Sequence, residues 1–314
     1  MSPPAVAVFS ATDVEAAVPP EVAVEAVRDA FVAHFRCEWT MPPKVYVTNY
    51  PAGDFRAMPA LGDGHALLKW VTSFPGNPAR GLPTVSGLVL LSDAETGELK
   101  AVLDAGAVTA LRTGAAAVLA AETLGRADAE TAAVVGAGVN GRAAARTFIA
   151  RGRPVSIWDV DPRRAEEAAA ALGAQVAGSL DEALASDLLV TVTPGHEVLL
   201  GDGSLVPGQH VSLMGADGPG KAEIAAAELA RTRMFCDDWE QASHGGELAH
   251  LVERGLVTEF EVGRIGAVLA GSEAGRTSPD EITTFDSTGL AIQDLAIALA
   301  AVERGGRTAA QLEL

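Results

Sequence analysis

Cysteine and lysine are scarce in this chain of 314 residues, and acidic residues outnumber basic ones. The two cysteines, Cys37 and Cys236, stand apart with no CxxC spacing, which argues against a disulfide framework and favours a reducing cytoplasm. The net charge of −18 argues against nucleic acid and anionic membrane surfaces, because both would repel the protein. The N-terminus lacks a basic start, and we expect no apolar run of the ~18 residues that a membrane span needs. We therefore expect a cytoplasmic protein with no membrane or nucleic-acid partner.

Histidine and lysine are rare enough to be considered one by one. The six histidines show no HExxH or comparable spacing, so we expect no metal site. Four lysines stand against nineteen arginines. The lysines mark positions where arginine was not used, and they are Lys44, Lys69, Lys100 and Lys221.

Two patterns follow one another along the chain and predict two domains. In the first hundred residues, a helix at 18–36 is followed by strand-like runs broken by Gly and Pro, at 45–48, 55–59, 67–74, 84–91 and 99–103. Residues 113–124 strongly favour a helix, and we expect this helix to bridge the domains. Beyond it, strand-like apolar runs are separated by alanine-rich segments that we expect to be helices. The strand-like runs lie at 132–135, 155–159, 188–192, 210–214 and 233–236.

The predicted fold class is therefore α/β. It combines a Rossmann-type, doubly wound parallel sheet with an α+β domain that we expect to bind the substrate. A last helix, from about Leu290 to Arg304, closes the chain. We assign residues 1–117 with 290–314 to the α+β domain and residues 118–289 to the domain with the parallel sheet, which the glycine-rich segment below marks as dinucleotide-binding.

The most informative segment is ThrAlaAlaValValGlyAlaGlyValAsnGlyArg at 131–142, which joins a strand-like run to a glycine-spaced turn and a helix. Gly136 permits the tight turn, Gly138 lets the backbone approach a pyrophosphate, and Gly141 lets the helix pack closely on the sheet. The helix from Val139 points its N–H groups at the phosphates. A glycine turn without a ligand is the alternative, and the strand–helix–strand context favours a dinucleotide.

Asp159 ends the next strand-like run, where an acid that binds the ribose is expected. Its carboxylate would hydrogen-bond the ribose of NAD and repel the 2′-phosphate of NADP. Arg163 and Arg164 lie just beyond and could offset that repulsion. The sequence therefore favours NAD and leaves NADP open.

Four cations lie on or beside the strands and the bridging helix, amid apolar neighbours: Lys44, Arg56, Lys69 and Arg112. Arginine binds a carboxylate in a two-pronged geometry, and lysine polarises a carbonyl or an imine. Together they predict an amino-acid or keto-acid substrate. The alternative is that each forms a surface salt bridge or snorkels from the sheet, and spacing alone does not show convergence.

A second polar cluster is MetGlyAlaAspGlyProGlyLysAlaGluIle at 214–224, at the carboxyl end of a predicted strand and before an expected helix. Ligands of open α/β sheets bind at this end, so Asp217 is suited to exchange a proton with a substrate amine or water. The alternative is that Asp217 caps the helix and that Lys221 is only its salt-bridge partner.

Several motifs together resemble the ornithine cyclodeaminase/mu-crystallin family. They are LysTrpValThr at 69–72, AsnPro at 77–78, LeuProThrVal at 82–85, LeuArgThrGlyAla at 111–115, the glycine turn, GlyAlaAspGlyProGlyLys at 215–221 and PheAspSerThrGlyLeuAlaIleGlnAsp at 285–294. The resemblance covers nearly the whole chain. It implies nicotinamide chemistry on amino acids, keto acids or cyclic imines, and a homodimer paired through the sheets of the first domain.

The resemblance also assigns roles to residues. It implies that Asp217 transfers a proton and that Lys69 polarises the imine. The substrate contacts that it implies are Lys44, Arg56, Lys69, Thr84 and Arg112. The cofactor contacts that it implies, beside the three glycines, are Val139, Asn140, Asp159, Thr193, Val211, Ser212, Leu213, Met214, Lys221 and Ser287.

The turn GlyAlaAspGlyPro favours one branch of this family, an enzyme similar to alanine dehydrogenase or ketimine reductase. In ornithine cyclodeaminases a cysteine commonly follows the aspartate. The alternatives are an ornithine or lysine cyclodeaminase, which would release ammonia with catalytic NAD, and a non-catalytic binder similar to mu-crystallin. The retained Asp217 argues against the binder.

Overall fold

A computed structural model describes residues 5–195, 197–218, 220–305 and 309–313. The chain forms two compact units, Met1–Arg112 with Leu290–Leu314, and Thr113–Gly289. The division falls inside helix α3 (Ala105–Leu124). The predicted α/β fold class is confirmed, because one unit contains a mixed sheet and the other a parallel sheet.

The first unit is built on a seven-stranded sheet with the order β15-β1-β6-β5-β4-β3-β2. Its strands are β1 (Ala5–Phe9), β2 (Val45–Asn49), β3 (Gly53–Gly62), β4 (His65–Ser73), β5 (Val85–Asp93), β6 (Leu99–Asp104) and β15 (Ala310–Glu313). Neighbouring strands are antiparallel except β1 and β6. Asp63 and Gly64, with φ of 48° and 69°, form the two-residue turn between β3 and β4 that an Asp-Gly pair favours.

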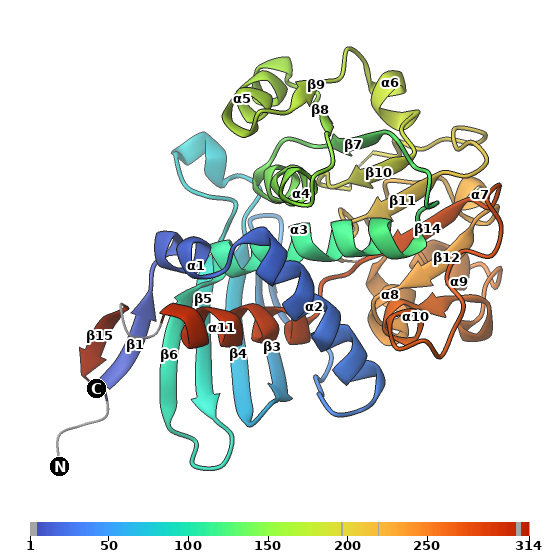
Figure 1. Cartoon of the computed structure of the whole chain (residues 1–314). Helices are drawn as coiled ribbons and strands as arrows, with labels where there is room; N and C mark the ends of the chain where they lie inside the picture. The colour runs from blue at the N-terminus through green and yellow to red at the C-terminus, as the bar shows by residue number, and fades with distance from the viewer. Residues whose placement is uncertain (1–4, 196, 219, 306–308, 314) are drawn as a thin grey trace. The chain divides into compact units, whose positions relative to one another are not determined.

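Helix α11 (Ala291–Gly305) packs on β3, β4 and β5 and against α2 (Pro20–Phe35), as Figure 1 shows. The sheet residues alternate accordingly. In β4, Leu68 and Trp70 are partly exposed, whereas Leu67, Lys69 and Val71 are buried. A lysine thus lies on the core face of this sheet.

The second unit contains an eight-stranded sheet with the order β13-β12-β14-β11-β10-β7-β8-β9, parallel throughout. Its strands are β7 (Ala132–Val135), β8 (Ser156–Trp158), β9 (Gln175–Val176), β10 (Leu188–Thr191), β11 (His210–Leu213), β12 (Arg233–Cys236), β13 (Gly263–Arg264) and β14 (Thr283–Asp286). The chain runs outward from β7 through β8 to β9 and then returns to β10, on the other side of β7. In doubly wound sheets, ligands bind at such a switch point, beyond the carboxyl ends of the strands.

Shorter elements complete the fold. The helices not yet given are α1 (Ala11–Ala17), α4 (Val139–Ala150), α5 (Pro162–Leu172), α6 (Leu180–Leu184), α7 (Ala226–Leu229), α8 (Trp239–Gly245), α9 (Ala249–Val252) and α10 (Ile265–Leu269). Two 3₁₀ turns are η1 (Asn77–Arg80) and η2 (Glu259–Glu261).

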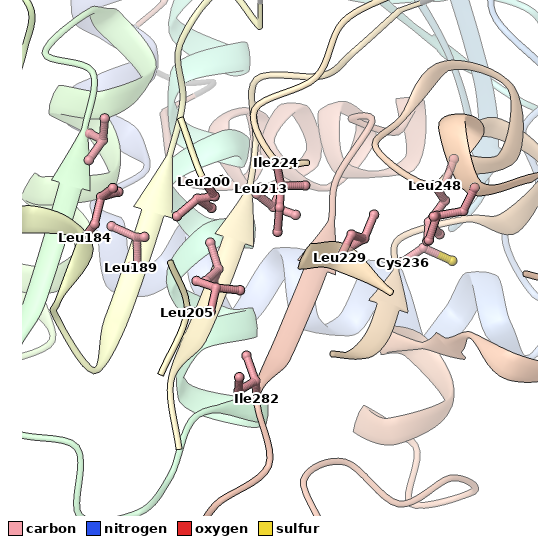
Figure 2. Packing of buried hydrophobic residues seen from close by; sticks show 14 of the residues in the cluster. Leu184, Leu189, Leu200, Leu205, Leu213, Ile224, Leu229, Cys236, Leu248 and Ile282 are labelled. Atoms are coloured by element: carbon pink, nitrogen blue, oxygen red, sulfur yellow. The ribbon is translucent and has the colours of Figure 1, made fainter. Parts of the chain in front are cut away.

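The core of the second unit gathers around its sheet. Figure 2 shows Leu189 of β10, Leu213 of β11 and Cys236 of β12 among buried aliphatic side chains such as Leu229 and Ile282. All residues of β7, β10, β11 and β14 are buried. Parallel strands covered on both faces are apolar in runs rather than in alternation, which is why the sequence predicted most of them.

Helix α3 corrects two expectations. It begins at Ala105 rather than residue 113, because the Asp104 carboxylate accepts the N–H of Ala107 at 2.7 Å and caps its first turn. At 20 residues it is long and apolar enough to cross a membrane, so the expectation of no such run is wrong. Most of this apolar stretch is nevertheless buried in the protein, as a core helix would be.

Candidate functional site

The first unit buries Lys69 in the centre of its sheet. Lys69 belongs to β4, where it is paired with Met58 of β3 and Val89 of β5, and the residue is 1% exposed. A charge in such surroundings needs an ionic partner. The Nζ of Lys69 donates to Oδ1 of Asp294 at 2.9 Å, and Asp294, in the first turn of α11, is completely buried.

This environment changes the acidity of Lys69. Burial lowers the pKa of Lys69 to about 8, the nearby Asp294 carboxylate opposes that decrease, and repulsion from Arg112 and Arg56 adds to it. An unperturbed lysine has a pKa of ~10.4. Lys69 therefore exchanges its proton much closer to neutral pH than an ordinary lysine does.

Arg112 lies beside this ion pair, and the charge of Arg56 also reaches Lys69. The Nε of Arg112, on α3, lies 3.7 Å from Oδ1 of Asp294. Arg56, on β3, donates from its Nε to Oδ1 of Asp54 at 2.7 Å, and its guanidinium lies over the ring of Tyr46. Three cations thus face two carboxylates in a largely buried region, an excess of positive charge that favours an anionic ligand.

Asp294 therefore brings Lys69 and Arg112 together, and Arg56 lies close enough for its charge to act on Lys69. Lys44 is half-buried and directly precedes β2, and Thr84 directly precedes β5. Their roles in substrate binding stay predictions. The sequence analysis did not identify Asp54 or Asp294 as site residues. Asp294 closes one of the family motifs, but the periodic pattern of α11 does not show which strand this residue faces.

The glycine turn of the second unit has the geometry that its sequence predicts. Gly136 follows β7 with φ of 110°, and a Cβ added to it would meet the carbonyl oxygen of Val192, beyond β10. A Cβ on Gly141 would collide with the carbonyl oxygen of Gly136. A Cβ on Gly138 would meet open space, so the fold leaves room there for another group to approach.

The first turn of α4 presents its backbone beside this space. Gly138 is the N-cap, and among the described residues no side chain caps the helix. Val139 is 71% exposed and Asn140 is half-buried. The first N–H groups of a helix lack partners within the helix, so this terminus suits a phosphate.

Asp159 is held next to the glycine turn. It directly follows β8, its Oδ2 accepts the N–H of Ala137 at 2.7 Å, and its Oδ1 accepts the N–H of Asp161 at 2.9 Å. Arg163 lies 3.6 Å from the carboxylate of Asp161, with its side chain 86% exposed. The acid expected to bind a ribose is thus fixed in place, whereas Arg163 remains largely in solvent.

Glu223 is a functional candidate that the sequence did not reveal. Its Oε1 accepts the N–H and the hydroxyl of Thr193, each at 2.7 Å, and its Oε2 accepts the hydroxyl of Thr191 at 2.7 Å and the N–H of Gly215 at 2.9 Å. Burial raises the pKa of Glu223, and the hydrogen bonds from Thr193 oppose that increase. This carboxylate joins the segment after β10 to the segment after β11.

Asp217 lies in the segment after β11, and its Oδ1 accepts the ammonium of Lys221 at 2.6 Å. The salt bridge between them is confirmed, but the helix expected directly after the turn is wrong, because α7 begins only at Ala226. Gly220, with φ of 77°, is incompatible with continuous helix here. Asp217 consequently does not act as a helix cap. Pro219 of this motif lies outside the described residues.

The remaining predicted cofactor contacts are buried near the carboxyl ends of β11 and β14. Val211, Ser212, Leu213 and Met214 are all buried. The hydroxyl of Ser287 donates to Asp237 at 3.2 Å. Their roles at a cofactor stay predictions, as does that of Thr193. Among the described residues, no group of three or more His, Cys, Asp and Glu side chains could hold a metal ion.

The sequence model of the ornithine cyclodeaminase/mu-crystallin family matches residues 5–307. This chain belongs to that family. Within it, alanine dehydrogenase of Archaeoglobus fulgidus is 40% identical over 300 residues, which cover 93% of this chain and 92% of that protein.

Solved structures of family members agree with the fold. An archaeal alanine dehydrogenase dimer with bound NAD superimposes with a TM-score of 0.93 at 37% identity, covering 99% of this chain and 100% of that one. The iminosuccinate reductase of Paracoccus denitrificans in complex with NAD⁺ gives a TM-score of 0.90 at 30% identity, with the same coverage. The Rossmann-type character of the predicted fold is thereby confirmed.

Proposed function

We propose that this family member is an NAD-dependent oxidoreductase of a small amino or imino acid, similar in chemistry to alanine dehydrogenase or to an imine reductase. The observation that carries the proposal is the buried Lys69–Asp294 ion pair, flanked by Arg56 and Arg112. Lysine is almost never fully buried in proteins unless its charge is paired. This group of cations matches a substrate with a carboxylate beside a reactive C–N bond. The relatives described above act on substrates of this class.

The second unit supplies the residues that would hold the cofactor. The open space at Gly138 and the uncapped first turn of α4 fit a pyrophosphate, and the carboxylate of Asp159 fits the two hydroxyls of a ribose. The buried Asp159 favours NAD over NADP. When bound, the nicotinamide supplies a hydride acceptor or donor.

Each residue then has a defined role in the oxidative direction. Arg56 and Arg112 would bind the substrate carboxylate, and the Lys69 ammonium would polarise the imine that forms when hydride leaves the α-carbon. Asp217, oriented by Lys221, would take a proton from the water that adds to the imine. The amino acid, water and NAD⁺ thereby become a keto acid, ammonia, NADH and a proton, and the reductive direction reverses every step.

We also propose a cytoplasmic homodimer. Leu68, Trp70 and Leu88 are 37%, 42% and 51% exposed on the outer face of β4 and β5, which suits a surface that is covered by a second copy. The dimeric archaeal structure supports this assignment. Light scattering of the purified protein tests it, and a monomer at micromolar concentration would contradict it.

Turnover assays test the activity. The protein is incubated with NAD⁺ or NADP⁺ and a panel of amino acids, and in reverse with NADH, keto acids, ammonia and cyclic imines. We expect reduced cofactor and ammonia to form together. Ammonia released from ornithine or lysine without net reduced cofactor would instead identify a cyclodeaminase, and no turnover with any substrate would favour a binding protein.

Two variants and a control sharpen this assay. Lys69→Gln and Asp217→Asn should each lower kcat/KM by about 100-fold or more, since each removes a polarising or proton-transferring group. Both should bind NAD as the wild type does. Lys100→Gln, at a lysine outside both proposed sites, is the matched control and should retain wild-type activity.

A further inference from the structure

We propose that Asp294 is the positioning residue of the substrate site: it acts through Lys69 and Arg112, holding both cations at one carboxylate oxygen so that their other N–H groups are oriented toward the substrate. The inference rests on the proposed function. It adds a residue on α11, remote in sequence from the cations that it would organise.

The geometry of Asp294 supports this role. Its Oδ1 accepts a hydrogen bond from Lys69 at 2.9 Å and lies 3.7 Å from the Nε of Arg112. Among the residues that the structure describes, its Oδ2 has no hydrogen-bond partner, and neither has the Nε of Arg112. A buried pair kept only for stability would be expected to satisfy these atoms, because each unpaired buried polar atom carries a desolvation cost.

Lys69 is the side chain through which Asp294 would act. An ammonium has three N–H donors, and among the described residues the acceptor is Asp294. That one contact fixes where Nζ lies on the buried face of β4, because the neighbouring Met58 and Val89 side chains provide no polar partner. The other two donors remain suited to a substrate carboxylate, carbonyl or imine.

Asp294 also compensates the charge of the site. Without its carboxylate, Arg56, Lys69 and Arg112 would be three cations with Asp54 as the acid that balances them. Lys69, whose pKa burial already lowers, would then lose its proton at a still lower pH. A neutral amine would polarise an imine poorly, so Asp294 would determine the pH range in which the site works.

The scarcity of lysine makes this testable in the full-length protein. With four lysines in the chain, isotope labelling of the ε-carbons gives four NMR signals, and arginine replacements of Lys44, Lys100 and Lys221 assign the signal of Lys69. In the wild type we expect Lys69 to titrate at a pH of about 8. In Asp294→Asn, we expect this titration to fall by about one pH unit or more.

Kinetics of the same variant test the positioning role. Asp294→Asn should raise KM for the substrate and lower kcat/KM by about 100-fold. In the pH profile of kcat/KM, the alkaline limb of this variant should shift to lower pH by the same amount as the Lys69 titration. The matched control is Glu98→Gln, which removes the acid of the partly exposed Lys100–Glu98 pair and should leave the Lys69 titration and turnover unchanged.

The outcomes separate the inference from the proposed function. An unchanged Lys69 titration in Asp294→Asn overturns the inference, and so does a shifted titration with unchanged KM and pH profile. If the wild type turns over no amino or imino acid, the proposed function fails. Pyruvate is then the probe: the inference stands only if pyruvate shifts the Lys69 signal and Asp294→Asn weakens that response.

A charge-conserving variant covers the case in which Asp294→Asn does not fold. Asp294→Glu keeps the carboxylate but moves it by one methylene. We expect the pH profile to stay in place while KM rises, because the charge remains and the orientation changes. An unchanged KM would contradict the positioning role.

Discussion

One carboxylate oxygen of Glu223 accepts two hydrogen bonds from Thr193, one from the backbone N–H and one from the hydroxyl of that threonine, each at 2.7 Å. The other oxygen accepts Thr191 and Gly215. Four donors therefore converge on one buried carboxylate, and an anion satisfies all of them. The residue proposed to contact the cofactor after β10 is thereby joined to the segment that leads to Asp217.

Glu223→Gln should weaken both the fold and cofactor binding. The amide replaces one acceptor oxygen with an NH₂ group that faces donors, which should lower the free energy of unfolding by about 1–3 kcal/mol. We expect the affinity for NAD to fall as well, because Thr193 loses its anchor. Urea unfolding and NAD titration measure the two effects. Glu166→Gln on the exposed face of α5 is the control, and wild-type values for both quantities in Glu223→Gln would disprove the coupling.

The glycines of the turn should separate stability from binding. A Cβ on Gly138 meets open space at a φ of −70°, so Gly138→Ala should keep its melting temperature and lose NAD affinity by about tenfold or more, because the methyl group occupies the space proposed for the pyrophosphate.

Gly141→Ala should lose both properties, since its methyl group collides with the carbonyl of Gly136. Thermal unfolding and NAD titration distinguish the two variants. Gly76→Ala, also at an open site with a negative φ of −78°, is the control. Equal NAD affinities in Gly138→Ala and the wild type would contradict the assignment of this turn.

Asp159 should determine cofactor preference. Asp159→Asn keeps an acceptor for the N–H of Ala137 but removes the charge that repels a 2′-phosphate. We expect the ratio of NAD to NADP affinity to fall by about tenfold. Titrations of both cofactors measure it, and Glu166→Gln again serves as the control. A ratio that stays at the wild-type value would show that Asp159 does not contact the ribose.

Asp286 should make the protein less stable as the pH rises. Burial, followed by repulsion from Asp237, raises the pKa of Asp286 to about 8, and hydrogen bonding by the N–H of Leu248 opposes the increase. The folded state then binds more protons than the unfolded state between the ordinary carboxyl pKa of ~4 and the folded value, so stability is full below this window and is lost through it.

The variant Asp286→Asn tests this pH dependence. It removes the titration and should flatten the decrease in unfolding free energy between about pH 5 and pH 8. Urea midpoints across that range measure the slope. Glu166→Gln, at an exposed carboxylate, should keep the wild-type slope. The same slope in Asp286→Asn as in the wild type would exclude Asp286 as its origin.

Local patterns were sufficient for much of the fold. The glycine spacing of 136–141 predicts a tight turn because only glycine tolerates φ of 110° and the approach of the neighbouring carbonyl, and both constraints act within a few residues. The apolar runs of β7, β10 and β11 predict buried parallel strands for the same local reason. The pattern failed at 214–224, where the turn does not continue into a helix.

The sequence by itself thus determined the fold class, the glycine turn with its acid Asp159, and the cations Arg56, Lys69 and Arg112 as candidates. Only the tertiary structure decided which acids face them. Lys69 and Asp294 are 225 positions apart, and Thr193 and Glu223 are 30 apart. Such pairs form because packing brings α11 onto β4 and joins the segments after β10 and β11, and no periodicity or spacing along the chain encodes which charged side chains then meet.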